Sequence, residues 1–248
     1  MILYNLVSRL FARKTSIVEV PGVSRKLSFH TTCAIETFRS VQFGGEEQFL
    51  REFVKRLSPN DVVWDIGASV GLFGLSAAIV VTSGEVYSFE PDRRIASRLR
   101  ENLLLNKVQN LRVLECAICD KEGEVDLFTN GVNGVSPSLR RQIREGAPEK
   151  ADLVQCDTID NLLSKGLIKP ASIVKIDIEG AEGLALRGME RFLQMNSPRH
   201  IFLELHPKFL PDFECTEEDC VASLTRLGYR TVWTEERADE IQHVFDKT

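Results

Sequence analysis

Apolar and polar positions change their spacing along the chain, and each change predicts an element. Between residues 46 and 57 apolar side chains recur at helical spacing, with Phe49, Phe53 and Leu57 on one face. Short apolar runs then alternate with longer segments of helical pattern. The predicted strands cover residues 62–66, 86–90, 111–117, 173–177 and 200–205, and the predicted helices cover 71–81, 91–106, 158–164 and 181–193. This alternation predicts a parallel sheet with helices on both faces.

The two ends of the chain and one internal stretch depart from the alternation. Residues 1–11 predict a short amphipathic helix packed on the domain, with peripheral membrane contact as the alternative, and 16–43 predict short strands. Strands at 124–128 and 154–156 flank a polar stretch, 129–152, which predicts a long loop, either a binding lid or a disordered surface segment. A helix at 217–227 and strands at 230–234 and 240–245 close the chain. We therefore expect an N-terminal extension, 1–44, and one domain, 45–248.

Composition narrows the class of partner. The net charge of −5 and the absence of a long Lys/Arg stripe argue against nucleic acid as the main partner and favour a small or uncharged substrate. No apolar run approaches the roughly 18 residues of a membrane span, so we expect no stable membrane insertion. Six cysteines in 248 residues indicate reduced thiols and a cytoplasmic protein. Cys116 and Cys119 form a C-x-x-C pair, but no second pair accompanies them, so we favour plain thiols over a metal or redox site.

Acidic residues recur where the predicted strands end. In open α/β sheets the ligand lies outside the carboxyl ends of the strands, so polar residues at these ends predict one shared site. The residues at these ends are Asp65 and Gly67, Glu90, Asp177 and Glu179, and Glu204 and His206.

The segment 62–74 joins a buried strand, an acid, a glycine-containing turn and a helix start. Its Asp65 would repel a dinucleotide pyrophosphate and attract the sulfonium and ammonium groups of S-adenosylmethionine (SAM). Glu90, at the end of the next strand, would accept hydrogen bonds from ribose hydroxyls. Gly67 would let the backbone approach the ligand. These residues favour SAM over NAD, with a nucleotide-dependent oxidoreductase as the alternative.

Three segments carry a resemblance to a known family. Residues 62–71 resemble motif I of class I SAM-dependent methyltransferases. Together with residues 89–91 and the K-I-D-I-E-G-A-E segment at 175–182, followed by Gly188, they resemble the FkbM family over about 45–207. The resemblance implies a Rossmann-like α/β fold with a mostly parallel seven-stranded sheet. It also implies SAM as cofactor and O-methylation of a hydroxyl on a sugar or another small metabolite.

Site roles follow from this resemblance and from the strand ends. The expected SAM-binding residues are Asp65, Gly67, Ala68, Ser69, Gly71, Glu90, Pro91, Cys116, Ala117 and Asp177. Among them, Cys116 and Ala117 would lie beside the adenine. For the proton of the acceptor hydroxyl, His206, Asp177 and Glu179 are the candidate catalytic residues. Lys175 and Glu204 are expected to face the substrate.

Two alternatives for this site stay open. The carboxylates and imidazole near the strand ends suit Mg²⁺ or Mn²⁺, but their spacing is not a ligand signature, so we predict no metal. A non-catalytic relative that binds a partner through the loop 129–150 is the remaining possibility.

Overall fold

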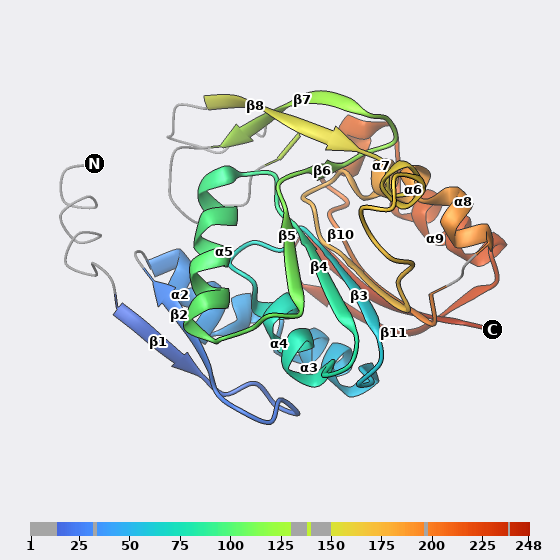
Figure 1. Ribbon diagram of the computed structural model, residues 1–248. Helices are drawn as coiled ribbons and strands as arrows, with labels where there is room; N and C mark the ends of the chain where they lie inside the picture. Colours follow the sequence, from blue (N-terminus) through green and yellow to red (C-terminus); the bar gives the residue numbers. More distant parts are fainter. Residues whose placement is uncertain (1–13, 32–33, 130–137, 140–149, 196–197, 238) are drawn as a thin grey trace.

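The computed structural model describes residues 14–31, 34–129, 138–139, 150–195, 198–237 and 239–248. Its middle layer is a seven-stranded sheet with helices on both faces (Figure 1). The strands, in spatial order, are β11 (Tyr229–Arg237), β12 (Glu240–Lys247), β10 (His200–Leu205), β9 (Ile173–Ile176), β3 (Val62–Ile66), β4 (Glu85–Phe89) and β5 (Leu111–Leu114). The strands from β10 to β5 are parallel, and β12 runs antiparallel to both neighbours. The predicted Rossmann-like, mostly parallel seven-stranded sheet is confirmed.

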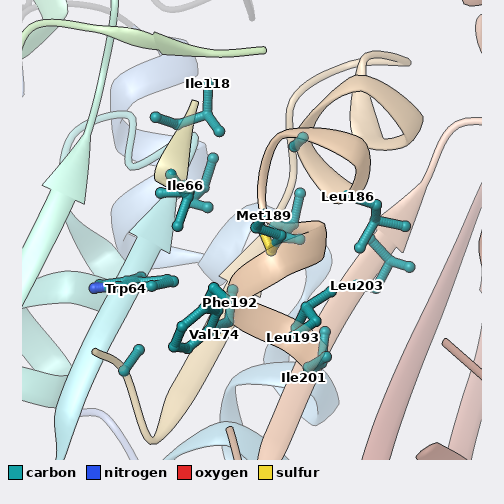
Figure 2. Packing of buried hydrophobic residues seen from close by; sticks show 14 of the residues in the cluster. Trp64, Ile66, Ile118, Val174, Leu186, Met189, Phe192, Leu193, Ile201 and Leu203 are labelled. Carbon is teal, nitrogen blue, oxygen red and sulfur yellow. The ribbon is translucent and has the colours of Figure 1, made fainter. Parts of the chain in front are cut away.

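Alternate residues of the strands enter two separate cores. On one face lie α3 (Glu47–Arg56), α4 (Leu72–Val80) and α5 (Arg93–Leu105); on the other lie α6 (Ile159–Ser164), α7 (Glu182–Gly188), α8 (Glu190–Met195) and α9 (Glu217–Arg226). Val63 packs in the first core with Phe49 and Phe53. Its neighbour Trp64 packs in the second, 4.5 Å from Phe192 between ring centroids (Figure 2). Both faces of the central strands are thus buried, which is why they read as continuous apolar runs.

The N-terminal segment packs on the same core as α3, α4 and α5. Strands β1 (Lys14–Val18) and β2 (Leu27–Thr31) form an antiparallel hairpin. Two asparagines, one in α5 and one at its C-cap, bind the backbone of the hairpin. Oδ1 of Asn106 accepts from the Ser28 N–H at 2.8 Å, and Oδ1 of Asn102 accepts from the His30 N–H at 2.9 Å. These bonds fix the hairpin beside the sheet.

One element of this segment was predicted wrongly. The expectation of strands over 16–43 holds for the hairpin, but α2 (Ala34–Val41) is a helix. The burial of its residues is the reverse of the usual amphipathic pattern: Glu36 and Ser40 are buried, whereas Phe38 and Val41 are exposed. A short 3₁₀ helix, η1 (Phe43–Gly45), links α2 to α3.

Two further predicted elements are divided. The expected strand 111–117 stops at Leu114, and β6 (Ala117–Ile118) joins a second sheet with β7 (Gly123–Thr129) and β8 (Lys150–Asp157). The expected helix 181–193 breaks into α7 and α8. A Cβ on Gly188 would lie 1.9 Å from the Cys119 carbonyl oxygen. The end of α7 therefore packs directly against the backbone of the segment between β6 and β7. A 3₁₀ helix, η2 (Leu210–Phe213), follows β10.

Two predicted segments lie mostly outside the described residues. They are the helix over 1–11 and the loop over 129–150, of which only Thr129, Ser138, Leu139 and Lys150 are described. Ser138 pairs with Phe128 through two backbone hydrogen bonds, of 2.8 and 3.1 Å. Within the described part of the chain, every helix is too short or too polar to cross a membrane.

Candidate active site

The site lies at the topological switch point of the sheet, where the order of the strands reverses. From β3 the chain order proceeds to β4 and β5 on one side, and to β9 and β10 on the other. A crevice forms at such a point, outside the carboxyl ends of the strands. Two adjoining cavities occupy it, and both are lined by Arg39, Gly67, Ser69, Asp177 and Glu179.

The two cavities differ in the chemistry of their remaining walls. The Glu90 cavity is lined in addition by Ile66, Phe89, Glu90, Pro91, Cys116, Ala117, Ile118, Leu127, Leu139 and Ile178. The acidic cavity is lined in addition by Phe38, Glu46, Ala68, Val70, Leu72, Phe73, Lys175, Glu204 and Glu240. The first therefore joins one carboxylate to a largely apolar wall, and the second gathers several carboxylates around one lysine.

The turn between β3 and α4 is fixed by its glycines and by Glu90. Gly67 has φ +81°, and a Cβ there would lie 1.8 Å from the Asp177 carbonyl oxygen. The space that Gly67 leaves thus admits the backbone after β9. The next residue but one, Ser69, has φ +50° and donates its N–H to Oε2 of Glu90 at 3.0 Å. Nη1 of Arg39 donates to the Ser69 hydroxyl at 3.0 Å, so α2 is tied to the turn.

Glu90 is a buried carboxyl with its acceptor sites only partly used. Glu90 directly follows β4 and is 3% exposed. Oε2 accepts from Ser69, and Oε1 accepts from the Asp92 N–H at 2.9 Å. Burial raises the pKa of Glu90 to about 7. Each carboxylate oxygen has two lone pairs and accepts one hydrogen bond from the residues that the structure describes, so among these residues one acceptor site on each oxygen is left for a ligand.

Asp65 lies behind the turn. It is fully buried, and it is not among the described residues that line the two cavities. Its Oδ1 lies 3.8 Å from Nζ of Lys175. Burial raises the pKa of Asp65. We expected Asp65 to contact the ligand directly, but it lies inside β3, which ends one residue later, and the turn covers its side chain.

Lys175 is a buried cation held among acceptors. Its Nζ lies 3.0 Å from Oδ2 of Asp177, 3.3 Å from the Gly67 carbonyl oxygen and 5.0 Å from the centroid of the Phe73 ring. Burial opposes its charge, but Asp177 and Asp65 raise the pKa of Lys175 above its ordinary value. Burial likewise opposes ionisation of Asp177, yet Lys175 and then His206 hold the pKa of that carboxyl below its ordinary value. The two form an ionised pair at neutral pH.

His206 lies behind the acidic cavity with both ring nitrogens near carboxylates. Its Nδ1 is 2.8 Å from Oε1 of Glu182, and its Nε2 is 3.9 Å from Oδ1 of Asp177, Oε2 of Glu179 and Oε1 of Glu204. Burial alone would lower its pKa, but the bond to Glu182 and the nearby negative charges raise the pKa of His206 to about 10. The carboxylates around the ring thus favour the protonated form of His206.

The site brings together most of the predicted residues and adds three that were missed. Pro91, Cys116 and Ala117 line the Glu90 cavity, and Ala68, Lys175 and Glu204 line the acidic cavity. Gly71 (φ +97°) instead begins α4 and packs on Leu99. The missed residues are Arg39, Glu46 and Glu240. They belong to no motif: Arg39 lies in α2, Glu46 directly precedes α3, and Glu240 begins the antiparallel strand β12. Only the folded chain therefore identifies them.

Fold and site together define a class I SAM-dependent methyltransferase. Residues 65–231 match the methyltransferase FkbM domain, and the chain belongs to that family.

Named relatives are similar to the chain in sequence, and a solved structure shares its fold. The chain is 25% identical over 195 residues to the hexuronic acid methyltransferase AglP of Haloferax volcanii, covering 78% of this chain and 75% of that protein. It is 26% identical over 170 residues to the 2-O-methyltransferase NoeI of Sinorhizobium fredii, covering 62% and 67%. The fold is shared with the fibrillarin pre-rRNA processing protein of Methanococcus jannaschii, with a TM-score of 0.51 and 10% identity over 95% of this chain and 89% of that one.

Proposed function

We propose that this methyltransferase transfers the methyl group of SAM to a hydroxyl of a sugar or another small metabolite. The observation that carries the proposal is the Glu90 carboxylate, which is buried at the end of β4 and held by two backbone N–H groups. It lies beside the glycine turn of β3, in a cavity that continues into a second, acidic one. The names of the relatives AglP and NoeI support the acceptor class, because they describe methylation of a hexuronic acid and at a 2-O position.

The Glu90 cavity fits the nucleoside half of SAM. Glu90 has one acceptor site left on each oxygen, which matches the two hydroxyls of a ribose. Cys116, Ala117, Ile118 and Leu127 line this cavity and form a wall suited to an adenine ring. This wall is mainly apolar, as nucleotide-base pockets usually are.

The other half of SAM would meet the junction of the two cavities. Arg39 and the backbone of Gly67 and Ser69 line this junction, and a guanidinium is a strong partner for an amino-acid carboxylate. We propose that Asp65 acts indirectly, by holding Lys175 behind the turn. When bound, SAM supplies a methyl group already activated by its positively charged sulfur. The protein then has to orient the acceptor and receive its proton.

Asp177 and Glu179 line both cavities, which supports a position at the point where donor and acceptor meet. An ionised Asp177 would accept a hydrogen bond from the acceptor hydroxyl and so orient its oxygen. The proton would then pass to a carboxylate of the acidic cavity. Burial raises the pKa of Glu46 to about 7, so this carboxylate can accept a proton near neutral pH. Burial also raises the pKa of Glu204 well above its ordinary value.

We further propose that residues 45–248 are the methyltransferase domain and that the extension 1–44 completes its site. The support is Arg39, which reaches from α2 to the turn after β3 and lines both cavities.

Titration calorimetry with SAM and with NAD tests the cofactor. We expect SAM alone to bind, and Glu90→Ala to weaken its affinity at least tenfold, because hydrogen bonds to a charged group contribute about 1.5–3 kcal/mol. The matched control is Glu218→Ala, which changes an exposed glutamate of α9. Binding of NAD in place of SAM would overturn the proposal. Transfer of labelled methyl to a panel of uronic acids, neutral sugars and non-sugar alcohols then identifies the acceptor.

A further inference from the structure

We propose that Asp177, Glu204 and His206 bind a divalent metal ion, of which Mn²⁺ is the best match, in the acidic cavity. One ligand atom from each residue lies within 4.8 Å of the others. Nε2 of His206 is 3.9 Å from Oδ1 of Asp177 and 3.9 Å from Oε1 of Glu204. Ligands bound at about 2.1 Å are separated by about 3 to 4.2 Å, so small side-chain shifts complete the site. The sequence prediction of no metal rested on spacing alone, and the fold now brings these residues together.

The two carboxylate ligands are each held from behind by a buried partner. Oδ2 of Asp177 pairs with Nζ of Lys175 at 3.0 Å, which leaves Oδ1 toward His206. Oε2 of Glu204 accepts from Nε2 of Gln242 at 2.6 Å, which leaves Oε1 toward the same imidazole. Outer partners of this kind fix the orientation of metal ligands.

The imidazole is held in the same way. Nδ1 of His206 is 2.8 Å from Oε1 of Glu182, a carboxylate with no exposed surface that also accepts the Gly180 N–H at 3.0 Å. A carboxylate behind the distal nitrogen is the usual support of a metal-binding histidine. Nε2 forms no hydrogen bond with any residue that the structure describes, although the side chain is only 3% exposed. A ring nitrogen that faces three carboxylates at 3.9 Å is placed to share a cation with them.

Charge balance favours the same conclusion. Asp177, Glu179 and Glu204 approach His206, and the nearby Lys175 is already shared between Asp177 and Asp65. A divalent ion bound among these side chains would offset their negative charge.

The ligand set selects the kind of metal. Two carboxylates and one imidazole combine hard oxygen donors with a nitrogen donor, which suits Mn²⁺ better than Mg²⁺. Three protein ligands leave coordination positions open toward the cavity. On the proposed function, an acceptor hydroxyl bound at such a position has a lowered pKa. Its O–H bond would break with the proton passing to Glu46 of the acidic cavity, and its O–CH₃ bond would form as the S–CH₃ bond of SAM breaks, leaving S-adenosylhomocysteine.

Manganese binding tests this site without any methyl transfer. The full chain is stripped with EDTA and titrated with Mn²⁺, with free Mn²⁺ followed by electron paramagnetic resonance. We expect one ion per chain, bound more tightly than Mg²⁺. His206→Gln and Glu204→Gln should weaken its affinity at least 100-fold. Glu182→Gln, which removes only the charge of the outer partner, should weaken it 10- to 100-fold. The matched control is His200→Gln, which changes the first residue of β10, the strand that ends just before His206. His200 is paired with Asp246, and its substitution should leave the affinity unchanged.

Two further readouts keep the test decisive. Calorimetry in buffers of different ionisation enthalpy should show about one proton released per Mn²⁺ bound at pH 8, and this release should vanish in His206→Gln. Circular dichroism establishes that each variant is folded. No Mn²⁺ binding by the folded wild type, or affinities that His206→Gln and Glu204→Gln leave intact, would overturn the metal site. A SAM titration of the metal-free protein tests the proposed cofactor separately, so the two failures are distinguishable.

Discussion

Replacing Glu90 by glutamine removes a buried ionisable group while keeping the shape of the side chain. Burial raises the pKa of Glu90 from its ordinary value of 4.5 to about 7. The folded state therefore prefers the protonated carboxyl. Its contribution to stability is fully present below pH 4.5 and is lost as the pH rises through 7. In the wild type this loss amounts to about 2.5 kcal/mol between pH 5 and pH 8, since one pKa unit corresponds to about 1.4 kcal/mol.

The glutamine variant lacks this pH dependence. Its amide group leaves one of the N–H groups of Ser69 and Asp92 without an acceptor, which costs about 1–3 kcal/mol at every pH. The free energy of unfolding of Glu90→Gln, measured relative to wild type, should therefore rise by about 2.5 kcal/mol from pH 5 to pH 8. This pH-dependent difference does not depend on the constant hydrogen-bond cost.

Urea unfolding at the two pH values, followed by tryptophan fluorescence, measures this difference. Glu218→Gln is the control, because its exposed side chain should leave the pH dependence unchanged. SAM affinity should fall in Glu90→Gln at pH 8 even as its relative stability improves. If the difference between Glu90→Gln and wild type were the same at both pH values, Glu90 would not carry a raised pKa, and the reasoning on its buried charge would be refuted.

Three other substitutions test the fold and the site. Gly67→Ala should abolish cooperative thermal unfolding, because its Cβ would meet a backbone carbonyl at 1.8 Å, whereas Gly166→Ala, also at positive φ but in open space, should cost only about 1–2 kcal/mol. Trp64→Ala should destabilise the protein by about 3–5 kcal/mol in urea, while Leu104→Ala, at a side chain 80% exposed, should stay within about 0.5 kcal/mol; equal losses would contradict the assigned core. Arg39→Ala should weaken SAM binding about tenfold by calorimetry, and an unchanged affinity would remove Arg39 from the site.

The central sheet was predictable because its strands are buried on both faces. Consecutive residues such as Val63 and Trp64 are both apolar, and such a run predicts a strand that is buried on both faces. The motifs at 62–71 and 175–182 then indicated the edge where the site lies. Acidic residues that follow parallel strands converge by topology alone, so the positions of Glu90 and Asp177 after their strands suffice to predict that they share one cavity.

The remaining features depend on contacts that pattern does not encode. In helix α2, Glu36 is buried and Phe38 is exposed, which is the opposite of the usual burial of apolar residues. The inward or outward position of a strand-end acid is also set by one residue of register: Asp65 is sealed behind the turn, whereas Asp177, one residue beyond its strand, lines both cavities. The approach of Arg39 to the turn depends on docking of the N-terminal segment, which has no signature in the sequence.

The central claim is that SAM occupies the crevice at the ends of β3 and β4. A crystal structure of the protein with S-adenosylhomocysteine tests it most directly. We predict that the ribose hydroxyls lie within hydrogen-bonding distance of the Glu90 carboxylate, and that the sulfur lies at the junction lined by Asp177. A fully occupied ligand elsewhere on the chain, or one whose ribose does not contact Glu90, would contradict the account.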